Sequence, residues 1–382
     1  SGLIHDAGGS AWWANLLGDG VVGGVGGVLV FLPQIVLLFL LIALLEGIGY
    51  LARAALMMDR VMSIGGLEGR AFVAMLSAFA CAIPGIMATR TMPNARDRLA
   101  TILAAPLITC SARLPVYALL VGMLVQPTTM VGPFNAQGAI MFAMYVLGGT
   151  TAMLAASIAK RIQGRKYAMP FSMELPPYRV PTARSVVTMM WVSASAFLRK
   201  AGTIILATTL ALWVLLNVPV PSTAQMEAAG VDVSDATAVS EYTLNQSAAA
   251  AIGRAVEPVF APLGFDWRVN VGIVASLSAR ETFVATMGQI ASASNPDDPS
   301  TELANLTYQS GERAGERVFS APTIVALLLF FAFALQCMST VGIMRRETGS
   351  WRWPGIAFGY MFALAWGAAF VGHTVTEWIV GR

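Results

Sequence analysis

The sequence carries little charge for its length. Lysine, arginine, aspartate and glutamate make up 12% of its 382 residues, whereas a soluble protein carries about 25%. Hydrophobic residues make up 56%, so polar side chains are too few to cover a fold in water. The formal net charge is only +3, and the basic residues stand in short clusters. This pattern predicts a lipid bilayer as the main surroundings and excludes a basic surface for nucleic acid.

Cysteine and histidine are scarce as well. The 3 cysteines are Cys81, Cys110 and Cys337, and an odd number at irregular spacing does not make a disulfide framework. The 2 histidines, His5 and His373, stand near the ends of the chain. Neither H-E-x-x-H nor G-x-S-x-G occurs, so an intramembrane enzyme ranks third among the functions that we consider.

Long apolar runs predict an all-α polytopic membrane protein. A helix of about 20 residues crosses a hydrocarbon core about 30 Å thick. The runs that fit a crossing are residues 28–51, 99–125, 139–159, 201–218, 319–343 and 353–379. Basic residues cluster at the ends of these runs that would lie on one side of the membrane, and the hydrophilic loops on the other side are acid-rich. By the positive-inside rule, the basic side is the inner one.

These runs divide the chain into four segments. Residues 1–27 have neither a basic n-region nor a cleavage pattern, so we expect an outer-side N-terminal segment rather than a signal peptide. Residues 28–160 form the first half and residues 201–382 the second. Residues 161–200 between them are basic and Pro-rich at first, which predicts a cytoplasmic linker followed by an interfacial helix.

Two apolar stretches have an interruption near their centres. Residues 71–89 contain Pro84-Gly85 and have arginine at both ends, which predicts a hairpin that enters and leaves from the inner side. Residues 269–290 lie between two outer loops, which predicts a hairpin from the outer side. Two oppositely oriented re-entrant, or broken-helix, hairpins would form an inverted repeat with a substrate site at mid-membrane. The alternative is two short spanning helices, one of them kinked at proline.

The second stretch has Arg280 and Glu281 at its centre. A carboxylate at membrane depth is costly and is retained mostly for ions, protons or substrates. The alternative is a structural ion pair with Arg280 or with Arg113. When the two stretches are aligned, Ser278 stands opposite Cys81.

The sulfur-containing side chains suggest a metal path. Cys81 precedes the Pro-Gly pair, Cys110 lies in an irregular stretch, and Cys337 is predicted in the middle of a later helix. A buried cysteine is often only a small hydrophobic residue. Thiolate, carboxylate and thioether ligands together, the last from Met87, suit a borderline divalent transition metal better than Mg²⁺ or Ca²⁺.

A series of motifs in order resembles the permease part of the ferrous iron transport protein B (FeoB) family. The motifs, which span residues 31–353, read FLPQIVLLFLLIALLEGIGYLARAALMMDR, FACAIPGIMATRTMPNARDRL, LITCSARLPVYAL, FSMELPPYRVP, FLRKAGTIIL, SLSARETFVATMGQI and QCMSTVGIMRRETGSWRW. The family's two Gate regions fall on the two predicted hairpins. The resemblance implies Fe²⁺ import across the bacterial inner membrane, with Cys81, Cys110 and Glu281 on the metal path. Two departures are the Ala80-Cys81-Ala82 context and Arg280, where the family often has lysine.

The resemblance also predicts partners and excludes some. Full-length members carry an N-terminal GTP-binding domain, but no G-x-x-x-x-G-K-[ST] motif occurs here, so GTP and Mg²⁺ would act through a domain outside this chain. We expect no permanently bound cofactor. Small Feo accessory proteins and further copies of the chain are the expected protein partners. The alternative function is a carrier for nucleosides or other organic solutes, because Gate-type hairpins also occur in that class.

Overall fold

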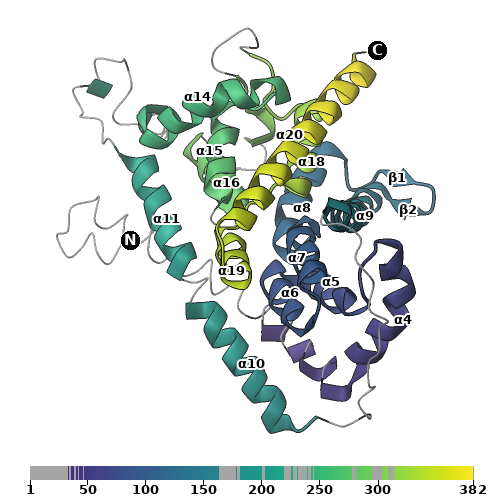
Figure 1. Ribbon diagram of the computed structural model, residues 1–382. Helices are drawn as coiled ribbons and strands as arrows, with labels where there is room; N and C mark the ends of the chain where they lie inside the picture. The colour runs from purple at the N-terminus through teal and green to yellow at the C-terminus, as the bar shows by residue number, and fades with distance from the viewer. Residues whose placement is uncertain are drawn as a thin grey trace, which may run out of the picture.

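The computed structural model is built from helices, with a short β-hairpin at one side (Figure 1). It describes residues 33, 36–37, 40–41, 43–45, 47–162, 178, 181–199, 203–218, 225–226, 230, 239, 242–243, 245–277, 280, 282–294, 303–308, 313 and 315–381.

The first half begins with a helical segment. Every described residue from 33 to 48 is helical, and Gly49 then turns the chain with a φ of 83°. The elements that follow, with η for a 3-10 helix, are α4 (Tyr50–Ile64), α5 (Arg70–Ala80), α6 (Ala82–Ala88), η2 (Thr89–Thr91), α7 (Ala95–Ala104), η3 (Ala105–Leu107), η4 (Ser111–Arg113), α8 (Leu114–Leu124), β1 (Met130–Val131), β2 (Phe134–Asn135) and α9 (Ala136–Ile162).

The predicted inner hairpin is formed by α5 and α6. A Cβ atom on Gly85 would lie 2.7 Å from the Ala74 carbonyl oxygen and 2.8 Å from the Ala78 Cβ. In a straight helix these positions would stand more than about 10 Å apart, so α6 folds back on α5. The break lies at Cys81, whose backbone is extended, and not at Pro84-Gly85 as predicted. Pro84 falls in the first turn of α6, where no intrahelical N–H donor is needed.

The second half repeats this order of elements. After α10 (Ala183–Phe197) in the connecting segment come α11 (Thr203–Asn217), α14 (Ala248–Phe260), η6 (Ala261–Leu263), α15 (Trp267–Ser276), α16 (Thr282–Ser294), α18 (Ala321–Phe333), α19 (Met338–Thr348) and α20 (Arg352–Val380). The series α4 to α9 therefore has its counterpart in α14 to α20.

The predicted outer hairpin is formed by α15 and α16. A Cβ atom on Gly272 would lie 2.8 Å from the Met287 Cε and 2.9 Å from the Phe283 Cδ2. The Thr282 hydroxyl donates to the Ala275 carbonyl at 2.9 Å, which ties the two arms near the break. The second predicted hairpin is therefore confirmed.

Four helical stretches among the described residues are long and apolar enough to cross a membrane. They are Ala95–Leu124, Ala136–Ile162, Ala321–Thr348 and Arg352–Val380. The first and third are broken helices, interrupted at residues 108–110 and 334–337. Within the described residues, each half thus contains one hairpin, one broken spanning helix and one continuous spanning helix. The inverted-repeat, polytopic helical fold predicted from the sequence is confirmed.

The long helix α20 shows that the halves are oppositely oriented (Figure 1). Near its start, the Tyr360 hydroxyl donates to the Leu103 carbonyl of α7, and further along, the Trp366 indole donates to the Val259 carbonyl of α14 at 2.9 Å. Near its end, His373 lies against Gly264, just before α15. Because Glu347, shortly before α20, binds Arg90 at the end of the first hairpin, α20 runs from the base of the first hairpin to the base of the second.

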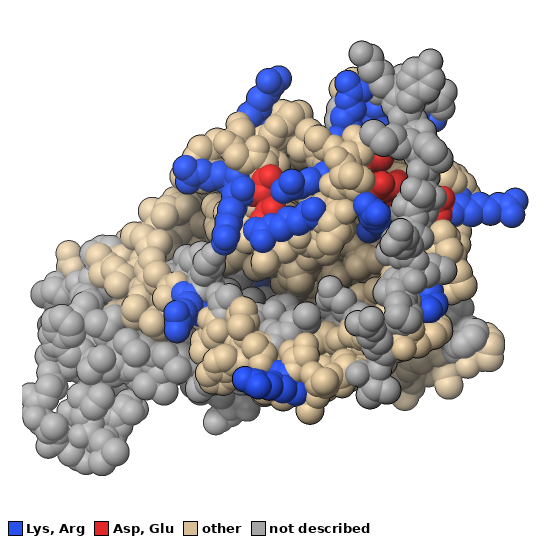
Figure 2. Space-filling view, turned by 60° about the horizontal axis from the view of Figure 1, so that its bottom comes forward, with Lys and Arg blue, Asp and Glu red and all other residues tan. Residues whose placement is uncertain are grey.

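One face of the protein is strongly basic. Figure 2 shows lysine and arginine side chains gathered there around a few acidic ones. Among the acidic residues, Glu347 of α19, whose side chain is 3% exposed, accepts from Arg90 and from Arg98, which flank the start of α7. This ion-pair cluster joins the two halves. The face matches the inner side that the positive-inside rule predicted.

Two amphipathic helices were not predicted. α4 buries Leu51 and Met62 while Met57 and Ile64 are exposed, and α14 precedes the second hairpin as α4 precedes the first. One of the acid-rich loops predicted on the outer side spans residues 219–246, and most of it lies outside the described residues, as does part of the predicted span 28–51.

Candidate functional site

All three cysteines stand at helix breaks. Cys81 precedes α6, Cys110 precedes η4 and α8, and Cys337 precedes α19, each with an extended backbone and a half-buried side chain. The prediction that Cys337 lies in the middle of a helix was wrong. The residues from Phe333 to Gln336 contain no proline or glycine, so no helix-breaking residue marks this break.

The two breaks of each half lie side by side. In the first half the Ser111 hydroxyl, next to Cys110, donates to the carbonyl of Ala80, next to Cys81, at 2.9 Å. In the second half the Met338 N–H, next to Cys337, donates to the Leu277 carbonyl at 3.1 Å, and Leu277 precedes Ser278. The aligned positions therefore make corresponding contacts, although one donor is a side chain and the other is backbone.

The halves meet along helices that begin or end at the breaks. α19 packs against α6, and α8 packs against α16 and α18. Because Arg90 after α6 contacts Glu347 near the end of α19, these two helices run in the same direction, with Cys81 and Cys337 at their starting ends. Half-helices that begin near mid-membrane are typical of ion and substrate sites in transporters.

Two buried arginines hold the broken ends together. Arg113 is fully buried and donates to the carbonyls of Leu107 and Pro106, both at 2.9 Å. Arg280, 4% exposed, donates to the carbonyls of Phe331 at 3.3 Å and Ala334 at 3.0 Å. These carbonyls lie where the first part of each broken helix ends, so each arginine satisfies acceptors that the break leaves without helical partners.

Two of the predicted site residues fall outside the described residues. These are Ser278 and Glu281, at the break between α15 and α16. Met87 is 38% exposed, six residues beyond Cys81 on α6, or about 9 Å along the helix axis. The structure therefore does not bring it to the break. Within the described residues no three histidine, cysteine or acidic side chains form a metal cluster.

Two polar residues beside the cysteines were not among the site residues predicted from the sequence. Thr109 precedes Cys110, is fully buried, and its hydroxyl donates to the Met144 carbonyl of α9 at 3.3 Å. Gln336 precedes Cys337 and is 1% exposed. The signal that could have found them is their position: a polar residue next to a cysteine in an otherwise apolar stretch.

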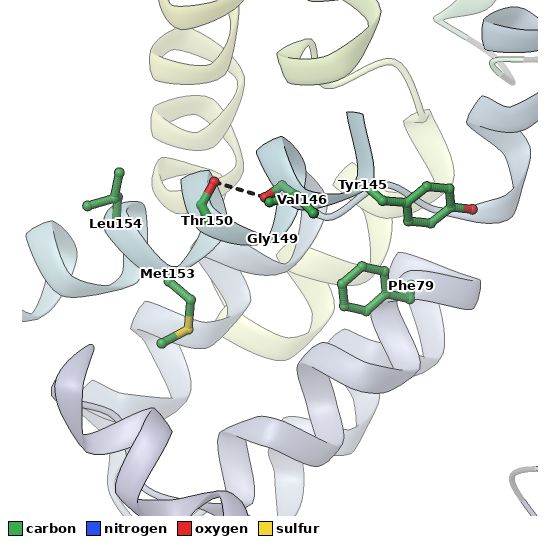
Figure 3. A pocket seen from close by; sticks show the side chains of 7 residues that line it. All are labelled: Phe79, Tyr145, Val146, Gly149, Thr150, Met153 and Leu154. Atoms are coloured by element: carbon green, nitrogen blue, oxygen red, sulfur yellow. Dashed lines mark hydrogen bonds between the residues drawn. The ribbon is translucent and has the colours of Figure 1, made fainter. Parts of the chain in front are cut away.

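An open groove lies near the first break but has a different character. It has a volume of about 620 Å³ and is lined mostly by α9, with Phe79 of α5 at its edge (Figure 3). The Phe79 and Tyr145 rings stack with centroids 6.2 Å apart, and the Thr150 hydroxyl is bonded to the Val146 carbonyl of its own helix. The lining is mostly apolar and contains no charged side chain and no cysteine, so the groove differs from the breaks.

Comparisons with known proteins agree with this architecture. The family model Gate, described as "Nucleoside recognition", matches residues 28–124 and 198–351, and the model described as "Ferrous iron transport protein B C terminus" matches residues 141–192. No solved structure matched the chain.

Curated relatives cover nearly the whole chain. A protein named Fe(2+) transporter FeoB from Leptospira interrogans is 41% identical over 95% of this chain and 51% of its own length. A Campylobacter jejuni protein of the same name is 33% identical over 95% of this chain and 56% of its own length. A fusion of Fe(2+) transport protein A with FeoB from Porphyromonas gingivalis is 37% identical over 94% of this chain and 44% of its own length. The chain spans about half the length of these relatives. It therefore belongs to the Gate family of membrane proteins and corresponds to the permease part of the FeoB transporters.

Proposed function

We propose that the chain conducts ferrous iron across the bacterial inner membrane into the cytoplasm, as the permease core of a larger transporter. The observation that carries this proposal is the position of the thiols, which stand at three helix breaks, two of them side by side in the first half. Thiolates bind Fe²⁺ but are poor ligands for Mg²⁺ or Ca²⁺. The names of the relatives support the same cargo.

The proposed metal path runs between the two pairs of breaks. Cys81 and Cys110 would receive the ion in the first half and Cys337 in the second. Glu281 and Ser278 would add oxygen ligands at the fourth break.

We propose that this chain performs no chemical reaction itself. Energy and regulation would come from a GTP-binding domain with Mg²⁺ in another part of the protein. The relative that is fused to Fe(2+) transport protein A supports small Feo proteins as accessory partners. Copies of the same chain remain a further proposed partner.

Transport of nucleosides is the second candidate, because the matching family model is described as "Nucleoside recognition". A nucleoside site is expected to offer aromatic faces and paired amides for the base. Sulfur at three breaks favours a metal instead.

Flux measurements on the chain in liposomes separate the two candidates. We expect Fe²⁺ entry that excess uridine does not reduce. Glu281→Gln should remain folded and lose Fe²⁺ flux, because glutamine keeps the shape of the side chain and removes the charge that replaces hydration water. Uridine flux without iron flux would support the nucleoside carrier. A stable Glu281→Gln protein with normal iron flux would remove Glu281 from the path.

A further inference from the structure

Gln336 has a buried side-chain amide that finds no hydrogen-bond partner among the residues that the structure describes. It lies in the extended segment between α18 and α19, directly before Cys337, and is 1% exposed. Neither its amide oxygen nor its amide nitrogen has a hydrogen-bond partner within the described structure. Buried side-chain amides nearly always have hydrogen-bond partners, and an unpaired amide lowers the stability of the fold. We therefore expect this amide to bind a ligand.

The equivalent residue of the first half shows that the position need not be unpaired. Thr109 stands before Cys110 as Gln336 stands before Cys337, and its hydroxyl is bonded to α9. The backbone at Gln336 is also held firmly. Arg280 donates to Ala334, two residues before it, and Met338, two residues after it, donates to Leu277. The side chain is therefore presented at the break by a fixed segment.

We propose that the amide oxygen of Gln336 is a ligand for the divalent cation that Cys337 binds. This inference rests on the proposed function and adds a specificity-determining residue to it. The amide oxygen of Gln336 can replace one water molecule in the hydration shell of the cation. The amide is neutral, so it adds no negative charge beside Arg280. One oxygen and one sulfur suit a borderline ion such as Fe²⁺, whereas a soft ion is held by sulfur alone.

The test compares a hard and a soft ion on the purified chain in lipid nanodiscs. Mn²⁺ binding is followed by electron paramagnetic resonance, and Cd²⁺ binding by its thiolate absorption band. Gln336→Leu should lower Mn²⁺ affinity about tenfold or more, the loss expected for one contact to a charged group. Its Cd²⁺ affinity should change by less than about threefold, since sulfur dominates for that ion. Gln336→Glu, which keeps an oxygen, should retain Mn²⁺ binding.

Thr109→Val is the matched control, at the same position of the other half. It should leave the ratio of the two affinities unchanged and lower the melting temperature, because it removes a satisfied hydrogen bond. Gln336→Leu should melt no lower than the parent. Unchanged Mn²⁺ affinity in Gln336→Leu would overturn the proposal, and so would parallel losses for both ions with a lower melting temperature. A parent chain that binds neither ion would instead overturn the proposed function before any variant is compared.

Discussion

The two halves reach the same backbone arrangement with different residues. A buried arginine satisfies carbonyls at each broken spanning helix, but Arg113 does so from its own helix and Arg280 from the neighbouring hairpin. The two breaks are joined by a serine hydroxyl in the first half and by a backbone amide in the second. What the repeat preserves is therefore the paired break itself. The chemistry placed on it differs, with a satisfied threonine in one half and an unpaired glutamine in the other.

Serine substitutions at Cys81 and Cys337 should have the largest effect on function. Both cysteines stand at the starting ends of helices that pack together, so we expect each change to lower Fe²⁺ uptake at least about tenfold, as losses around metal sites commonly do. Met87→Leu removes a sulfur atom away from the break and should leave uptake unchanged. A loss confined to Cys81→Ser would mean that the second half contributes no thiol.

Leucine at Arg113 or Arg280 should cause the largest losses of stability. Each change leaves two buried carbonyls without a donor, at about 1–3 kcal/mol for each unpaired group. Unfolding in mixed detergent micelles measures both losses. Arg60→Leu, at an exposed position on α4, should cost nearly nothing. A much smaller loss for one buried arginine would show that its half satisfies the carbonyls in another way.

Alanine substitutions at Gly85 and Gly272 should show that the first hairpin is packed more tightly than the second. At Gly85 the new methyl group meets the Ala74 carbonyl and the α5 backbone at Ala78, neither of which can move without distorting the helix. At Gly272 it meets the end of Met287 and the ring edge of Phe283, which can rotate. We expect Gly85→Ala to cost about 1–3 kcal/mol and Gly272→Ala less. Equal melting temperatures would contradict the tighter packing of the first hairpin.

Substitutions of the acidic residues that precede the two hairpins, Glu68 and Asp266, should give the smallest changes in stability. Burial, and then the nearby Asp97, raise the pKa of Glu68 above its ordinary value of 4.5. A raised carboxyl pKa means that stability is lost as pH rises above the unfolded value. Glu68→Gln should therefore melt higher than the parent at pH 7 and equally below about pH 4.

Asp266 is the counterpart before α15. Burial raises its pKa as well, although Arg268 opposes that shift and pairs with it at 2.8 Å. The raised pKa by itself would favour asparagine at pH 7, but Asp266→Asn should lower the melting temperature, because it leaves Arg268 buried without its carboxylate. A lower melting temperature for Glu68→Gln as well would show that Glu68 is stabilised by its neighbours.

Much of the fold could be predicted from the sequence because lipid restricts the backbone strongly. The long apolar runs, both hairpins and the basic inner face followed from helix length, charge and the cost of a broken helix. The break at Cys337 could not be predicted, since the stretch from Phe333 to Cys337 contains no helix-breaking residue. The break of the first hairpin was predicted at Pro84 and lies at Cys81, because a sequence does not distinguish a proline in the first turn of a helix from a proline at a kink. Gln336 and the carbonyls bound by Arg280 depend on packing between the halves, which local patterns do not contain.

X-ray absorption at the iron edge tests the central claim most directly. The chain loaded with one equivalent of Fe²⁺ should show sulfur scatterers in the first coordination shell beside oxygen. The triple variant Cys81→Ser, Cys110→Ser and Cys337→Ser should lose the sulfur signal. A first shell of oxygen and nitrogen alone in the parent chain would contradict a metal path through the helix breaks.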